Sequence, residues 1–177
     1  MTIMTRSLLG RAGPALFLAS AMVLPAAAAD RRQSFEVSAS VVRGCVVTAE
    51  AGGRWGAISL GTVNGLPGTS ATGTLLSGGV AGLALSCTPG TRVNVTADAG
   101  DHAVAGQRRL QRNGGNEALG YALYADGGTT AWTTQAVTLT FADDVARRML
   151  PVTASATLAQ AMPAGTYTDT VRVTLTF

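Results

Sequence analysis

Apolar and polar residues alternate with a period of two over residues 167–177, at the end of the chain. This period places alternate side chains on opposite faces of a β-strand. Threonines and an arginine occupy one face. We predict a strand there with one buried face, preceded by a turn at Pro163 and Gly165, on which the chain ends. The predicted buried residues are Tyr167, Val171, Val173, Leu175 and Phe177.

A second alternating segment lies near the other end, at residues 33–42. Phe35, Val37, Ala39 and Val41 alternate there with polar residues, and a break at Gly44 precedes a further strand over 45–49. The residues alone leave two interpretations open. The segment is either the first strand of its own domain or a free strand that pairs elsewhere.

The region between these ends has the composition and punctuation of short strands. Gly-Gly and Pro-Gly pairs separate the runs, and no stretch carries a long helical stripe. Short strands between regular turns predict an all-β protein, an antiparallel sandwich in one domain. The candidate strands are 56–60, 80–87, 91–97, 117–125, 136–142 and 149–158.

The first residues have the pattern of a secretory signal peptide. A basic start is followed by a short apolar run and by Ala26–Ala29, a small-residue cleavage site. A membrane anchor is the alternative, but the run is shorter than the roughly 20 residues that span a bilayer. We predict cleavage after Ala29, export, and no membrane insertion of the mature chain.

Charge indicates no polyanionic partner. All 13 basic residues are arginines, and two of them leave with the signal peptide, so the rest nearly balance the 10 acidic residues. Nucleic-acid binding is therefore not expected. Arg108, Arg109 and Arg112 form the nearest approach to a basic patch, and a solvated strand end or loop explains them equally well.

Two cysteines, Cys45 and Cys87, remain after export. An even pair in an exported protein predicts a disulfide, with two free buried thiols as the alternative. A loop of this length would give about 4 kcal/mol of stabilisation at most.

Candidate catalytic residues are few. His102 is the single histidine, and it has no accompanying nucleophile or metal-ligand motif. Asp143 and Asp144 are adjacent and resemble a charged turn, while Asp98 and Asp101 fit a solvated loop. We therefore expect no enzyme activity, metal or cofactor.

Several segments resemble the spore coat protein U domain family, the Csu-type pilins of archaic chaperone–usher pili. They are the alternating segment 35–41 shortly before Cys45, the L-x-Y-x-L-Y-x-D run at 119–126 followed by Trp132, the A-G-T-Y-T-D-T stretch at 164–170, and the alternating C-terminal end. The resemblance covers nearly the whole mature chain, and the C-terminal motif is the most specific part.

The resemblance implies an immunoglobulin-like sandwich that lacks its last strand. A periplasmic chaperone and then a neighbouring pilin subunit, delivered at an outer-membrane usher, would fill the gap by β-strand addition. The donor strand would then be 30–42, with Phe35, Val37, Ala39 and Val41 inserted, and the pilin domain 43–177. The five residues of the last strand would line the acceptor groove of a surface fibre serving adhesion or biofilm formation.

A different class of function is also open. A secreted carbohydrate-binding module or tip adhesin would use loop aromatics, of which Trp55 and Trp132 are the candidates.

Overall fold

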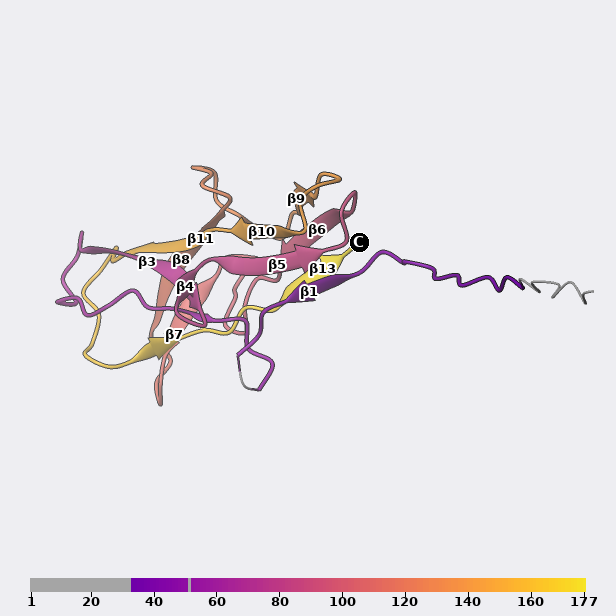
Figure 1. Cartoon of the computed structure of the whole chain (residues 1–177). Coiled ribbons are helices and arrows are strands. Elements are labelled where there is room, and N and C mark those ends of the chain that lie inside the picture. Colours follow the sequence, from indigo (N-terminus) through magenta and orange to yellow (C-terminus); the bar gives the residue numbers. More distant parts are fainter. Residues whose placement is uncertain (1–32, 51) are drawn as a thin grey trace, which may run out of the picture. The chain divides into compact units, whose positions relative to one another are not determined.

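The computed structural model describes residues 33–50 and 52–177 (Figure 1). The predicted signal peptide at 1–29 lies outside these residues. Within them every helix or strand assigned is a strand, which confirms the all-β prediction. All of these strands lie in the part Ser40–Phe177; of the part before it, the structure describes residues 33–39. The strands are β1 (Cys45–Val47), β2 (Ala57–Ile58), β3 (Ser70–Ser77), β4 (Val80–Ala81), β5 (Leu83–Cys87), β6 (Arg92–Ala97), β7 (Arg109–Arg112), β8 (Ala118–Ala125), β9 (Val137–Thr140), β10 (Arg147–Leu150), β11 (Val152–Thr157), β12 (Tyr167–Thr168) and β13 (Val173–Thr176).

The strands form three antiparallel sheets around one core. Their orders are β1-β5-β10, β12-β7-β8-β11-β3-β2 with β4 also pairing with β3, and β13-β6-β9. Leu85 of β5, Val95 of β6, Leu123 of β8 and Ala154 of β11 all belong to the same buried cluster. Inward faces from all three sheets therefore bury a shared interior, as in a sandwich.

The predicted strand 149–158 is divided at Pro151 into β10 and β11. Proline has no N–H to give to a ladder, so pairing is interrupted there. The partner changes at the same point: Leu150 lies opposite Leu83 of β5, whereas Val152 lies opposite Ala125 of β8. One extended segment thus belongs to two sheets.

The predicted strand 80–87 is divided in the same way, at Gly82, into β4 and β5. Gly82 has φ +94°, and a Cβ on it would lie 2.7 Å from the carbonyl oxygen of Leu150. Only glycine fits this close approach of two backbones.

Two strands, β3 and β7, were not expected from the sequence. The inward positions of β3 are Ala71, Gly73, Leu75 and Ser77, so its apolar alternation is weak. A side chain at Gly73 would collide with the backbone of Ser59, because the chain next to β2 crosses it there. The close packing at position 73 requires glycine, and glycine interrupts the apolar alternation from which a strand is predicted.

The last predicted strand, 167–177, is also not continuous. β12 joins the large sheet, where Tyr167 lies opposite Arg112 of β7. β13 joins a different sheet, where Val173 lies opposite Ala97 of β6. The intervening residues 169–172 carry no strand. The alternation in burial nevertheless continues through the interruption, since Val171 is half-buried and Thr170 and Arg172 are exposed.

Candidate functional site

β1 and β13 are edge strands. β1 pairs only with β5 and β13 only with β6, and no ladder among the described residues joins the other side of either strand. An edge strand presents unpaired backbone N–H and C=O groups to which another strand can be added. The sheets also end at β10, β9, β12 and β2. β1 and β13 are the edges next to or within the two alternating segments at the ends of the described chain, and they are therefore the candidates for strand addition.

The inward side chains of these edges are less buried than those of their neighbours. Leu85 on β5 is 1% exposed and Val95 on β6 is 0% exposed. The inward apolar residues on β1, on β13 and just before β13 pack against the core but are only partly buried. We call this set the edge strip: Cys45, Val47, Val171, Val173 and Leu175. The core is closed at β5 and β6 and partly open along the edge strip.

The other two residues predicted to line the groove are placed differently. Tyr167 is half-buried on β12, in another sheet, and its hydroxyl donates to the carbonyl of Pro163 at 2.8 Å. Phe177 follows β13 and is 59% exposed. The expectation of one buried face with five members is therefore wrong for Phe177, and Tyr167 lies outside the edge strip.

Asp169 organises the interruption between β12 and β13. Its Oδ2 accepts a 2.7 Å hydrogen bond from the Tyr121 hydroxyl, and its Oδ1 accepts one of 3.1 Å from the backbone N–H of His102. Burial, and then the bonded carboxylate, raise the pKa of Tyr121, so the phenol stays protonated and remains the donor. In the alternation of residues 167–177, Asp169 occupies a position of the apolar face. A carboxylate at such a position indicates that it has hydrogen-bond partners inside the fold.

Arg172 holds the start of β13 against the end of β6. Its backbone N–H donates to Asp98 Oδ1 at 2.9 Å, and its carbonyl accepts from the Asp98 N–H at 2.9 Å. Its guanidinium also pairs with Asp101 at 2.5 Å, but this ion pair is exposed and contributes little. The backbone bonds position the neighbouring Val171 and Val173 in the edge strip.

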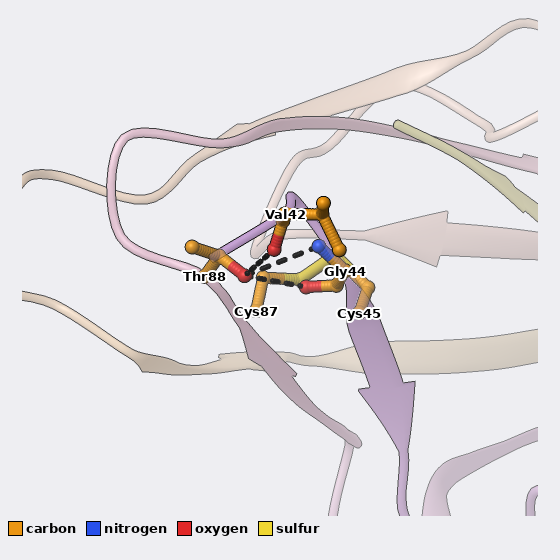
Figure 2. The surroundings of a disulfide bond; sticks show 5 residues. All are labelled: Val42, Gly44, Cys45, Cys87 and Thr88. Atoms are coloured by element: carbon orange, nitrogen blue, oxygen red, sulfur yellow. Dashed lines mark hydrogen bonds between the residues drawn. A yellow bond between two sulfur atoms is a disulfide. The ribbon is translucent and has the colours of Figure 1, made fainter. Parts of the chain in front are cut away.

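A disulfide joins Cys45 and Cys87, as predicted, across the β1–β5 ladder (Figure 2). Their Cα atoms are 4.1 Å apart, and the two residues are 42 positions apart in the chain. Thr88 adds contacts beside the bond. Its backbone N–H donates to the Gly44 carbonyl at 2.9 Å, and its hydroxyl oxygen accepts from the Gly44 N–H at 3.1 Å and lies 3.3 Å from the Val42 carbonyl.

The predicted donor residues are exposed. Phe35, Val37 and Val41 are 87%, 82% and 86% exposed, and Ala39 is exposed too. Residues 33–44 carry no strand. Large apolar side chains in this state keep their full burial energy available for a partner.

The sequence profile of the Spore Coat Protein U domain matches residues 31–174. This chain belongs to the spore coat protein U domain family. The resemblance drawn from its motifs is confirmed.

One solved structure with a similar fold is the CsuC–CsuE chaperone–tip adhesion subunit pre-assembly complex from the archaic chaperone–usher Csu pili of Acinetobacter baumannii. The TM-score is 0.53 and the sequence identity is 20%, and the match covers 78% of this chain and 40% of that chain. At this identity the likeness concerns the fold alone, and the present chain spans less than half of the solved one. No curated protein sequence matches.

In this spore coat protein U domain, the aromatic residues considered for sugar binding pack inward. Trp132 is 5% exposed, and its indole N–H donates to the Gln135 carbonyl at 2.9 Å. The interpretation of Trp132 as a sugar platform is therefore wrong. Trp55 is partly buried against the core.

Arg108 is not part of a solvated patch. It is 7% exposed, and it donates to the backbone carbonyls of Asp98 at 2.6 and 3.0 Å, of Thr133 at 3.1 Å, and of Trp132. Burial lowers its pKa. Its guanidinium connects the loop at 132–133 to the end of β6 through these hydrogen bonds.

The remaining polar candidates do not form a recognisable metal or catalytic cluster among the described residues. Among residues 33–50 and 52–177, no three His, Cys, Asp or Glu side chains lie close enough to share a metal ion. Asp143 and Asp144 lie exposed in a turn, as expected. His102 borders a shallow polar hollow with Arg112 and Asn113. In the same part of the chain, no helix has the length and apolarity to span a bilayer.

Proposed function

We propose that this chain is a structural subunit of a surface pilus. In this proposal a periplasmic chaperone and an outer-membrane usher assemble it, and the N-terminal segment of one subunit pairs with the edge strip of the next. The donor strand is residues 30–42 and the acceptor domain is residues 43–177. The chain is exported through the periplasm to the cell surface, and the fibre serves adhesion or biofilm formation.

One observation carries the proposal: the chain has an exposed segment of alternating apolar residues, and it also has an apolar edge that none of its described strands covers. Phe35, Val37 and Val41 are exposed, while Val173 and Leu175 of the edge strip are only half-buried. Burying each large side chain is worth about 1.5–3 kcal/mol, so the two features favour each other between copies of the chain.

The spacing of the two parts also agrees. Alternate residues of a strand lie about 6.6–6.8 Å apart, and both the donor residues and the residues Val171, Val173 and Leu175 follow that interval. A strand added to the free side of β13 would give its backbone groups partners and place its apolar face over the edge strip.

A chaperone fits the same surface before assembly. A half-buried apolar edge invites wrong pairing until it is covered. The solved complex with a similar fold pairs a chaperone with a tip adhesion subunit before assembly. That supports a chaperone as the first partner here and a second subunit as its replacement.

Displacement of the chaperone by a peptide tests the proposal. The chaperone–subunit complex, made with residues 30–42 deleted, is mixed with a peptide of residues 33–42, and free chaperone is measured by size-exclusion chromatography. The wild-type peptide and a Ser38→Asp peptide should release the chaperone, and a Val37→Asp peptide should not. Failure of the wild-type peptide, or equal behaviour of the two variants, would overturn the proposal.

A further inference from the structure

The disulfide lies where the N-terminal segment enters the domain. Residues 33–44 carry no strand, and Cys45 is the first residue of β1. A pull on the N-terminal segment therefore meets only the hydrogen bonds of Thr88 with Val42 and Gly44 before it reaches Cys45, the first covalent link to the domain. β1 has only three residues and one ladder, with β5. Without a covalent link, a pull at its end would separate its pairs one after another.

β5, on the other side of the bond, is much better held. It pairs with both β1 and β10, and its Leu83 and Leu85 are each 1% exposed. Cys87 is itself 5% exposed. The bond thus connects the weakly held end of an edge strand to an interior strand anchored in the core.

Thr88 reinforces the same point. Its hydroxyl contacts Gly44 and lies 3.3 Å from the Val42 carbonyl (Figure 2). Its backbone N–H also donates to the Gly44 carbonyl. These contacts hold Val42 and Gly44, just before Cys45, beside the end of β5.

We propose that the Cys45–Cys87 bond is the point at which tension in an assembled fibre passes from the N-terminal segment into the body of the subunit. This inference rests on the proposed function. β1 has two tasks in such a fibre, because it receives the pull of its own segment and contributes Val47 to the strip that holds the next subunit's segment. The bond separates these tasks: tension enters β5 directly, and β1 keeps its place in the strip.

The test is to stretch wild-type fibres with optical tweezers before and after reduction with a phosphine. Thiol labelling verifies that the bond is open, and electron microscopy verifies that unloaded reduced fibres are intact. After reduction, the force of the first yielding event should fall by about half or more. Each event should also release chain between residues 45 and 87, up to about 140–150 Å at 3.3–3.6 Å per residue.

Thr88→Val fibres serve as the matched control. They lose the hydroxyl contacts but keep the bond, and they should yield at the wild-type force. Equal forces before and after reduction would overturn the inference, as would a Thr88→Val fibre as weak as the reduced one. Reduced fibres that fall apart without load would overturn it too, because the bond would then serve folding and not tension. A wild-type chain that forms no fibres contradicts the proposed function instead.

Discussion

Leu175 of β13 and Val95 of β6 are direct partners in one antiparallel ladder, yet Val95 is fully buried and Leu175 is only half-buried. The difference follows from their neighbours. Val95 also has Val137 of β9 on its other side, whereas Leu175 lies on an edge. The boundary of the closed core runs between these two residues.

Leu175→Asp should prevent capture by the chaperone as well as fibre formation. A carboxylate there would be buried without a partner once any strand covers the edge strip. Thr174→Asp, one residue away on the exposed face, should retain both. Copurification with a tagged chaperone measures capture. Equal losses in the two variants would show that β13 does not present its inward face to a partner.

Val37→Asp should abolish fibres while leaving chaperone capture intact, since it changes the donor and not the acceptor. Ser38→Asp should be tolerated far better because it faces the other way. Electron microscopy of the cell surface and copurification of the chaperone give the two readouts. If Val37→Asp already prevents capture, residues 33–42 belong to the subunit's own sandwich and donation is wrong.

Moving the donor strand to the other end of the chain should stabilise the subunit against aggregation. A mature chain without residues 30–42 should aggregate when no chaperone is present. The same chain with residues 33–42 fused after Phe177 through a short flexible linker should be a soluble monomer with a raised unfolding temperature. Gel filtration and thermal melts compare the two. A well-behaved monomer from the deletion alone would argue strongly against an uncovered edge strip.

Stability at high pH should report on Tyr121. Its folded-state pKa lies above the ordinary value of 10.0, so the folded protein keeps the proton to higher pH than the unfolded chain does. The stabilisation is fully present below about pH 10 and falls as the pH rises beyond it. Melts of the strand-transferred monomer between about pH 8 and 11 should show this decline, and Tyr121→Phe should flatten it. An unchanged slope in Tyr121→Phe would contradict the assignment of this decline to Tyr121.

The strands with large alternating residues could be predicted from the sequence. Val137, Leu139 and Phe141 carry an apolar period of two that local sequence alone makes clear, and the last two are fully buried. The all-β character followed from equally local signals, and the pairing of Cys45 with Cys87 followed because they are the two cysteines of the chain. The candidate donor residues were visible for the same reason.

The remaining features depend on partners distant in the chain. β3 has no clear apolar alternation because the backbone of Ser59 leaves room only for glycine at position 73. Asp169 divides the last strand because its acceptor atoms meet Tyr121 and His102, which belong to other segments. Arg108 can be buried because its guanidinium meets the backbone carbonyls of Ala97, Asp98, Trp132 and Thr133. No window of sequence contains both halves of these interactions.

The Cys45–Cys87 bond also closes residues 45–87 into a covalent ring. Exposed residues outside any strand lie within that ring, including Gly61, Val63, Leu66 and Pro67. A protease that cuts there opens the ring but detaches nothing, because the residues before Cys45 stay joined through sulfur to Cys87 and everything after it. In the proposed fibre, a subunit nicked in this loop would stay covalently joined to its own N-terminal segment, so the fibre would survive cleavage that would sever an unbridged chain.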